Sequence, residues 1–464
     1  MGGLERGMEG MLQIPIPEEV RDILQTLRAK GYAAYAVGGC VRDSLLGAVP
    51  NDWDICTAAR PEQTVDCFPG ERVLLTGARY GTVTLLRGEA GYEITTFRAE
   101  TGYSDARHPS DVAFLDTLAG DLSRRDFTIN AMAADENGYV VDPFGGRDDL
   151  RHGILRCVGE PTARFTEDAL RMLRALRFAS RFDLRVERHT ASALHELRDL
   201  LHRVSSERIA KELCGLLRGA AAARVLREFS DAVCVVLPEL SACIGFDQHN
   251  PHHAYDVWEH TLHAIDAAEP DVILRLAVLL HDTGKPDCFS TDAAGIGHFY
   301  NHAERGAELA RAALTRLHFD RETIGRVTRL IAEHSRELPA DSPRALRRLL
   351  VRMDGARDAR LLLRLRRADR MGTGTRPAWK IEQETAAVEA ALAAVLAQKP
   401  PMSVRELALS GGELMAFGLR DRQIGQMQQR LLAAVLDGAV ENSCEALSEL
   451  VKSDLKSENR HGID

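Results

Sequence analysis

Short apolar runs separated by glycine-rich turns dominate the first third of the chain. The runs lie at 32–37, 53–58, 81–86, 92–97 and 139–144. Runs of this length, bounded by turn residues, are typical of β-strands. An amphipathic pattern at 17–30 precedes them and predicts a leading helix. We therefore expect residues 1–150 to form a region that mixes helices with a sheet.

After residue 150 the pattern lengthens into amphipathic segments rich in leucine, alanine and arginine. Apolar residues recur there at helical spacing, and few strand signals remain. Proline and glycine interrupt the pattern near 245–253 and 398–402, which marks expected domain borders. The rest of the chain is predicted to be mostly helical.

Composition agrees with a protein of several packed domains. The chain has 464 residues, of which 45% are hydrophobic, and length alone predicts about three domains. Its nine cysteines are scattered without CxxC spacing, which indicates reduced thiols rather than a disulfide framework or a zinc ribbon. The first twenty residues contain Glu5 and Glu9 and no long apolar run. We therefore expect no signal peptide and no membrane span, with the cytoplasm as the default location.

The net charge of −9 argues against a surface dedicated uniformly to nucleic acid, but local basic stripes remain. Residues 171–188 contain six arginines, and Arg171, Arg174 and Arg177 would form one ridge on a helix. A second arginine-rich stretch lies at 344–370. It is either a phosphate-facing surface or a solvated helix face, and the sequence leaves both open.

The most informative stretch is residues 38–55, where a glycine pair precedes two aspartates. Gly38 and Gly39 let backbone N–H groups approach a polyphosphate closely, because glycine has no Cβ. If 51–56 is extended, Asp52 and Asp54 point to the same side and can share a divalent cation. Two hard carboxylates suit magnesium. The alternative is a tight βα turn followed by a surface acidic pair.

A second pair, Asp168 and Arg171, would face the same side of a helix because three positions separate them. A carboxylate accepts from an exocyclic amine while a guanidinium donates to the neighbouring ring nitrogen. Cytosine and adenine both offer this pairing edge, whereas uracil and guanine do not. The pair therefore predicts selection of CTP and ATP, and the alternative is an ordinary surface salt bridge.

Several motifs follow in a fixed order after the glycine–aspartate stretch: RRDFTINAM (124–132), DPFGG (142–146), EDALRMLRALRF (167–178) and RIAKEL (208–213). Together they resemble the bacterial class II tRNA nucleotidyltransferases and poly(A) polymerases. The resemblance implies an α+β fold with a polymerase β-like mixed-sheet nucleotidyltransferase head at 1–150. An all-α neck that selects nucleotides and binds RNA would follow at 151–245, then an HD-type helical domain at 246–370 and a helical, tRNA-binding tail at 371–464.

The resemblance also implies an activity: addition of C, C and A to the tRNA 3′ end from CTP and ATP, with release of pyrophosphate. Two Mg²⁺ ions would act at Asp52 and Asp54, and Glu93 is the expected third carboxylate by its order and strand alternation. The expected nucleotide contacts are Gly38, Gly39, Arg42, Arg124, Arg125, Asp126, Asp168, Arg171, Arg174 and Arg177. The segment between 98 and 123 corresponds to the family's flexible loop, and its full length favours complete CCA addition.

Histidines concentrate in the second half of the chain, where ten of the 16 fall between 249 and 334. The surrounding motifs resemble the HD phosphohydrolase pattern, which implies a metal set of His260, His281, Asp282 and Asp369, with His302 and His334 as a second position. A divalent transition metal or magnesium there would support hydrolysis of a 2′,3′-cyclic or terminal phosphate on tRNA ends, with Lys285 on the substrate phosphate. The alternative is a helical body that only packs against RNA.

Two other functions stay open. One is a poly(A) polymerase, or a partial CC- or A-adding enzyme, of the same fold. The other is an RNA-binding protein without activity, against which the intact Asp52 and Asp54 pair argues. The oligomeric state is not predicted by the sequence.

Overall fold

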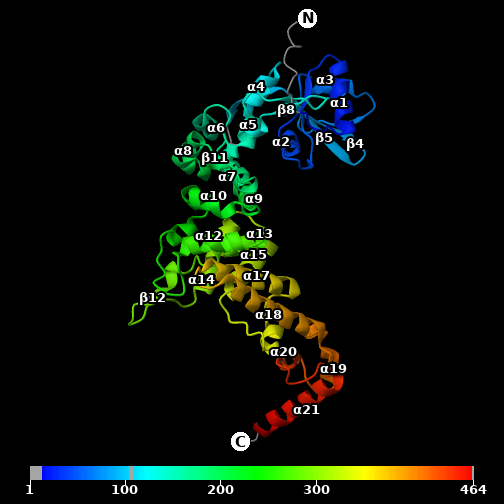
Figure 1. Cartoon of the computed structure of the whole chain (residues 1–464). Coiled ribbons are helices and arrows are strands. Elements are labelled where there is room, and N and C mark those ends of the chain that lie inside the picture. The colour runs from blue at the N-terminus through cyan, green and yellow to red at the C-terminus, as the bar shows by residue number, and fades with distance from the viewer. Residues whose placement is uncertain (1–12, 104–108, 462–464) are drawn as a thin grey trace. The chain divides into compact units, whose positions relative to one another are not determined.

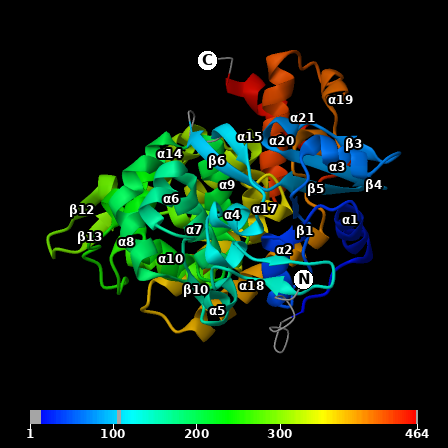
Figure 2. The same ribbon diagram turned by 90° about the horizontal axis from the view of Figure 1, so that it is seen from above.

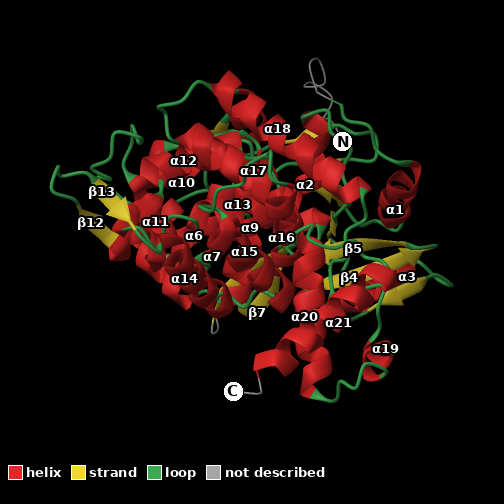
Figure 3. Cartoon of the chain, turned by 90° about the horizontal axis from the view of Figure 1, so that it is seen from below, coloured by secondary structure: helices red, strands yellow, loops and turns green. Residues whose placement is uncertain are grey.

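The computed structural model describes residues 13–103 and 109–461. The chain divides into two compact units, Met1–Val236 and Leu237–Asp464. Figure 3 shows that the large sheet belongs to the head and that helices make up most of the remainder. The predicted α+β class, with a mixed-sheet head followed by helical parts, is therefore confirmed.

The head is built on a seven-stranded sheet of order β3-β4-β5-β2-β1-β8-β9. Its strands are β1 (Ala34–Val37), β2 (Ile55–Thr57), β3 (Arg72–Leu74), β4 (Thr82–Arg87), β5 (Ala90–Thr96), β8 (Ala133–Ala134) and β9 (Val140–Val141). Only the β2–β5 pair among them is parallel, so the sheet is mixed. The sequence pattern predicted five of these strands and missed the short β3 and β8.

Apolar residues cover both faces of this sheet. On one face α1 (Glu18–Ala29) and α3 (Pro61–Cys67) belong to a core that includes Ile23, Leu85 and Ile94 (Figure 1). A second core contains Phe97 and Leu122 and lies toward α4 (Leu118–Ser123). The central strands β1 and β2 are buried almost throughout, which explains their nearly continuous apolar runs, whereas buried residues alternate with partly exposed ones along β4.

The register of β1 and β2 decides where the glycine turn and the two aspartates lie relative to each other. The two strands are antiparallel, with Ala36 opposite Ile55, and the Val37 backbone N–H donates to the Asp54 carbonyl across 2.9 Å. The end of β1 therefore meets the start of β2 at one edge of the sheet. This pairing brings the glycine turn that opens α2 (Gly39–Leu45) next to the aspartates.

The predicted flexible loop after β5 contains a hairpin. Strand β6 (Arg98–Tyr103) pairs antiparallel with β7 (Pro109–Phe114). Residues 104–108, between the two strands, lie outside the described residues.

Seven helices follow the sheet within the described part of the first unit, the first of them at the border of head and neck. They are α5 (Gly146–Arg151), α6 (Pro161–Glu167), α7 (Leu170–Arg181), α8 (Arg188–Leu197), α9 (Ser206–Leu217), α10 (Ala222–Glu228) and α11 (Ser230–Val236). The chain at Gly219, just beyond α9, approaches α7 closely, since a Cβ on Gly219 would lie 2.6 Å from the Ser180 carbonyl oxygen. This close approach packs the C-terminal end of α7 against the chain beyond α9.

The second unit is a bundle of helices with one small hairpin. Its helices are α12 (Val257–Ala267), α13 (Val272–Leu280), α14 (His302–Arg316), α15 (Arg321–Glu333), α16 (Pro343–Arg352), α17 (Ala356–Gly372), α18 (Ala378–Ala397), α19 (Gly411–Met415), α20 (Arg422–Leu436) and α21 (Cys444–His461). Figure 2 shows the hairpin of β12 (Phe289–Thr291) and β13 (Gly297–Phe299) at the margin of the bundle. None of the described helices is both long and apolar enough to cross a membrane.

The arginine-rich stretch at 344–370 is largely occupied by contacts within the protein. Arg344 and Arg348 both bind Asp437, at the end of α20, across 2.7 to 2.9 Å. Arg326 on α15 binds Asp358 at the start of α17. This part of the stretch joins helices and does not present a continuous phosphate-facing surface.

Candidate active site and metal centre

A hollow of about 470 Å³ lies between the edge of the sheet and the neck, and we call it the head–neck hollow. Its lining comprises Gly38, Gly39, Arg42, Asp52, Asp54, Arg124, Arg125, Asp126, Asn130, Asp168, Leu170, Arg171, Arg174, Arg177, Phe178, Arg181 and Arg208. Twelve of these were expected from the sequence. Glu93, the expected third carboxylate, lies on β5 outside this lining.

Two features of the structure favour glycine at position 38. Gly38 has a φ of +84°, in the region that residues with a Cβ rarely adopt. A Cβ there would also lie 2.8 Å from Arg125 Nη1. Beyond the turn, the guanidinium of Arg42 is buried and donates to the side chains of Asp43 and Asn130. Gly38 therefore leaves room for an arginine side chain at the hollow.

The two aspartates precede β2 rather than lie within it, so the expectation that 51–56 forms a strand is wrong at its start. Antiparallel pairing with β1 still brings both carboxylates to the hollow. Partial desolvation, followed by the charges of Asp52 and Glu93, raises the pKa of Asp54 to about 6. Three carboxylates that repel one another form a site whose repulsion a divalent cation would relieve. Glu93 therefore acts on this site electrostatically.

Asp168 and Arg171 do not share a helix, which corrects the expected i,i+3 geometry. Helix α6 ends at Glu167 and α7 begins at Leu170, and Asp168 between them is extended, with φ −144° and ψ 103°. Its carboxylate accepts from the backbone N–H of Leu170, the first residue of α7, at 3.0 Å. The sequence missed this break because the apolar spacing continues through it. Both side chains nevertheless line the hollow.

The partners of these two side chains differ. Asp168 Oδ2 accepts from Arg208 Nη2 at 2.8 Å. Arg171 binds Glu167 at 2.7 Å and donates to the Arg124 carbonyl. Arg208 was missed as a site residue, although it opens the RIAKEL motif. Asp168 is thus held in place by Arg208, and Arg171 is held by Glu167.

Asp126 is bound by an arginine. Arg174 Nε donates to Asp126 Oδ2 across 2.7 Å, and Asn130 donates to the other oxygen at 3.1 Å. Burial alone would raise the pKa of Asp126, but Arg174 and the Asn130 hydrogen bond outweigh it and lower the pKa. Asp126, one of the expected nucleotide contacts, thus binds an arginine of the neck in this structure. Asn130 was missed as a site residue, although it lies inside the RRDFTINAM motif.

The charge of the hollow is predominantly positive, with eight arginines and four aspartates in its lining. Arg124 and Arg125 both bind the buried Asp121, at 2.9 and 3.4 Å. Guanidinium groups held in this way can donate to phosphate oxygens without further ordering. The arrangement suits a triphosphate beside a divalent cation.

The expected metal-binding residues of the second unit form one group, which we call the HD cluster. It comprises His260, His281, Asp282, His302, His334 and Asp369. They come from α12, the turn after α13, the start of α14, the end of α15 and α17. His281 and Asp282 directly follow the last residue of α13.

Ligand atoms in the HD cluster lie close together. His260 Nε2 is 3.1 Å from Asp369 Oδ1, and His281 Nε2 is 3.2 Å from Asp282 Oδ2. On the other side of Asp282, His334 Nε2 is 3.8 Å from Oδ1. Two triads, His260–His281–Asp369 and His281–Asp282–His334, each have ligand atoms within 4.8 Å of one another. Two such triads that share a histidine fit a divalent metal centre.

The electrostatics of the HD cluster explain how several charged groups are stable in a buried site. Burial alone would lower the pKa of His281, but Asp282 and Asp369 outweigh it and raise the pKa to about 10. Burial, followed by His281, lowers the pKa of His334 to about 3, so this imidazole is neutral. Lys285 is buried and binds Asp282 and Gln248, each across 2.7 Å. It therefore supports a metal ligand, and the expected substrate phosphate contact is not available to it in this arrangement.

Three family models match the chain in order. The poly A polymerase head domain matches residues 34–156, the probable RNA and SrmB-binding site of polymerase A matches 183–243, and the HD domain matches 252–373. The first falls within the unit that carries the head–neck hollow, the second begins in that unit and ends seven residues beyond its border, and the third contains every residue of the HD cluster.

Curated relatives resemble the first half of the chain. The CCA-adding enzyme of Levilactobacillus brevis is 46% identical over 209 residues, which is 44% of this chain and 52% of that protein. The CCA-adding enzyme of Geobacillus stearothermophilus is also 46% identical over 209 residues, 45% of this chain and 51% of that protein. The chain thus matches about half the length of these relatives.

Solved structures resemble the chain over almost its whole length. The Bacillus stearothermophilus CCA-adding enzyme in complex with CTP has a TM-score of 0.73 and 28% identity, and the match covers 96% of this chain and 98% of that one. The Thermotoga maritima CCA-adding enzyme complexed with tRNA shares the fold, with a TM-score of 0.59 at 21% identity, over 94% of this chain and 96% of that one.

Proposed function

The chain combines a poly A polymerase head domain, an RNA-binding segment and an HD domain, and on this basis we propose that it adds C, C and A to the 3′ end of tRNA. The substrates are CTP and ATP, and pyrophosphate is released. The observation that carries the proposal is the head–neck hollow, where an aspartate pair, a glycine turn and eight arginines line one space. We assign 1–150 to the head, 151–245 to the neck, 246–370 to the HD domain and 371–464 to the tail.

Asp52 and Asp54 are the residues that would hold Mg²⁺ in the hollow. Bound there, two ions would acidify the primer 3′-hydroxyl and neutralise charge on the triphosphate and leaving pyrophosphate. Glu93 adds negative charge to the same site, since it contributes to the raised pKa of Asp54. Arg42, Arg124 and Arg125 face the space where the triphosphate would lie.

Base selection is assigned to Asp168 and Arg171. The carboxylate accepts from the exocyclic amine of cytosine or adenine, and the guanidinium donates to the adjacent ring nitrogen. Uracil and guanine would leave polar groups unpaired, which costs about 1 to 3 kcal/mol for each buried group. Arg208 holds the Asp168 carboxylate from α9, so the protein presents a fixed edge in place of a template base. Arg174, which binds Asp126, would contact the nucleotide beside this pair together with Arg177.

Incubation with tRNA that lacks its terminal trinucleotide tests the head. With CTP and ATP the products should end in C, C and A and then stop, whereas CTP alone should stop after cytidines. Continued extension with ATP alone would instead support the poly(A) polymerase alternative. Asp52→Asn should abolish every addition, and Asp148→Asn, at an exposed pair with Arg151, is the matched control.

The HD cluster supports a second activity, hydrolysis of a 2′,3′-cyclic or terminal phosphate at tRNA ends. His260, His281, Asp282 and Asp369 would hold a divalent metal, with His302 and His334 completing a second position. Such a metal, magnesium or a transition metal, would supply Lewis acidity toward the phosphoester and its attacking water.

A phosphatase assay tests this activity. Hydrolysis of a 2′,3′-cyclic nucleotide by the full chain should require added metal and should be lost in His281→Ala. His202→Ala changes an exposed histidine of the neck and should behave like the parent chain. Equal activity in His281→Ala and the parent would reject the proposal and favour a helical domain that only packs against RNA.

We place both activities in the cytoplasm. All nine cysteines are free thiols in the structure, and five of them are buried. This usage suits a reducing compartment, where tRNA ends are also available.

A further inference from the structure

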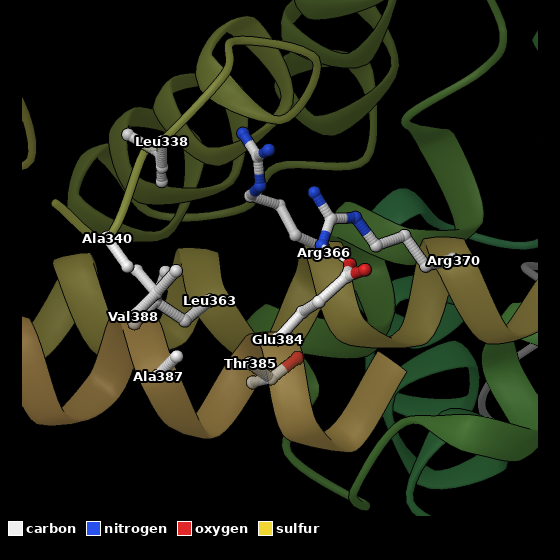
Figure 4. Close-up of a pocket in the computed structure, with 9 residues that line it drawn as sticks. All are labelled: Leu338, Ala340, Leu363, Arg366, Arg370, Glu384, Thr385, Ala387 and Val388. Atoms are coloured by element: carbon white, nitrogen blue, oxygen red, sulfur yellow. Dashed lines mark hydrogen bonds and ion pairs between the residues drawn. The ribbon is translucent and has the colours of Figure 1, made fainter. Parts of the chain in front are cut away.

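A cavity between α17 and α18 lies apart from the head–neck hollow and is used by neither proposed reaction. Its volume is about 250 Å³. Figure 4 shows Arg366 and Arg370 side by side at one end, with Glu384 reaching toward them from α18. Leu338, Ala340, Leu363 and Val388 form the other end. The cavity is therefore apolar at one end and positively charged at the other.

Arg366 lacks the partners that its neighbours have. Its Nη1 is shielded from solvent and has no hydrogen-bond partner among the described residues. Arg370, in contrast, binds Glu384 at 3.2 Å, and Arg376 binds the same carboxylate at 2.6 Å. A shielded guanidinium nitrogen without a partner costs free energy, and an anion in the cavity would remove that cost.

Burial, followed by the charge of Arg370, lowers the pKa of Arg366 to about 10, so the guanidinium is charged at neutral pH. The cavity therefore presents a cation, not a neutral donor. Asp369 and Glu337 lie near enough for their charges to raise the pKa of Arg366 in part, but neither lines the cavity, and the one carboxylate in the lining already binds two arginines.

The cavity borders the HD cluster. Arg366 precedes Asp369 by one turn of α17, so the two side chains project from neighbouring positions of one helix. Leu338 and Ala340 lie on the segment that follows His334 at the end of α15. Two segments that carry cluster residues thus continue directly into the wall of the cavity.

We propose that this cavity binds the phosphate next to the one that the HD cluster hydrolyses at a tRNA end, and that Arg366 is the residue that contacts it. The inference rests on the phosphohydrolase activity proposed above. A guanidinium can donate two parallel hydrogen bonds to one phosphate, and Leu338 and Val388 provide apolar surface for the attached sugar. The volume is smaller than the roughly 300–1,000 Å³ of most ligand pockets, which suits a single nucleotide end.

Calorimetric titration of inorganic phosphate into the full chain, treated with a chelator, tests the cavity without hydrolysis. Arg366→Gln should weaken one binding event about tenfold or more, the effect of losing a hydrogen bond to a charged group. Arg364→Gln removes the same charge from an exposed position of α17 and should leave the isotherm unchanged. The head–neck hollow also attracts phosphate, so the event lost in Arg366→Gln must persist in Arg174→Gln.

Ala387→Phe provides a second variant that leaves Arg366 in place. Ala387 is an exposed residue of α18 in the cavity lining, so a larger side chain should fill the cavity without disturbing the core. It should weaken the same binding event. Arg366→Lys, which keeps the charge but not the planar fork, should show an intermediate affinity.

Hydrolysis kinetics separate the cavity from the reaction. With a dinucleotide that ends in a 2′,3′-cyclic phosphate, Arg366→Gln should raise KM about tenfold and leave kcat within about twofold. If the parent chain hydrolyses nothing while the Arg366-dependent phosphate binding persists, the binding site stands and the phosphohydrolase proposal fails. If hydrolysis occurs and Arg366→Gln changes neither the isotherm nor KM, the assignment of the cavity is overturned.

Discussion

Arg208 of α9 donates to Asp168 across 2.8 Å, and Asp168 is the residue that separates α6 from α7. The contact joins two motifs that lie forty positions apart in the chain. It fixes the carboxylate that we assign to base selection, and it makes Arg208 a positioning residue for that choice.

Asp168→Ala should relax nucleotide choice. Incorporation of UTP and GTP relative to CTP and ATP should increase about tenfold or more, because uracil and guanine would no longer leave an unpaired carboxylate. Competition between labelled nucleotides on a tRNA lacking its last three residues measures the ratio. Cation affinity at Asp52 and Asp54 should not change, and an unaltered ratio would reject the role of Asp168.

Arg208→Ala should relax the same choice, but less, because Asp168 keeps its hydrogen bond from the Leu170 N–H. Selectivity should fall while kcat with CTP falls by a smaller factor. The double variant should be no less selective than Asp168→Ala alone, since Arg208 acts through that carboxylate. Additive losses would mean that Arg208 contacts the nucleotide itself.

Asp54→Asn should raise stability while it abolishes nucleotide addition. The pKa of Asp54 is about 6 in the fold against an ordinary 3.8, so between these values the folded state binds more protons than the unfolded state. Stability should therefore fall as pH rises through this window. At pH 7.5, without metal, the substitution should raise the free energy of unfolding by about 1 kcal/mol, since solvent screens part of the effect. Thermal unfolding measures this gain, which should vanish below pH 4.

Metal binding at the HD cluster should release protons. His281 has a pKa of about 10 without metal, so it is protonated at neutral pH and must lose a proton to become a ligand. Affinity should rise with pH, and titration calorimetry in buffers of different ionisation enthalpy should show about one proton or more released per ion. A heat independent of buffer would contradict this expectation.

The same protonation makes the stability of the metal-free chain depend on pH. The folded state binds the extra proton on His281 between pH 6.5 and about 10, so the free energy of unfolding should fall as pH rises through that window.

Gly38→Ala should weaken nucleotide binding, an effect that backbone strain at a positive φ does not produce by itself. The position has a φ of +84°, and the added Cβ would displace Arg125. Gly31→Ala is the matched control, because Gly31 has a φ of +91° with nothing within 4 Å of its Cβ position. Both should lose about 1 to 3 kcal/mol of stability, the cost of a residue in a sparsely populated backbone region, measured by denaturant unfolding. Only Gly38→Ala should raise the KM for CTP.

The sequence alone indicated most of the local structure. Alternating and helical apolar spacing identified the leading helix, five strands of the head sheet and the change to a helical remainder, because burial imposes those periods on the chain. It also supplied the chemistry, since aspartates, arginines and histidines occur in motifs whose residue types suit phosphate and metal binding. Short elements such as β3 and β8 were missed, because two or three residues carry no period.

Tertiary structure alone decided how these residues meet. The β1–β2 register brings Gly38 and Asp54 to one edge, and the break at Asp168 lets Arg208 bind its carboxylate. Neither contact is visible in local spacing, since both join segments that are distant along the chain. Burial likewise set the charge states, because the pKa of His281 depends on Asp369, which α17 brings to it from almost ninety residues away. Residue type and order therefore determined the chemistry available, whereas packing determined which groups share one site.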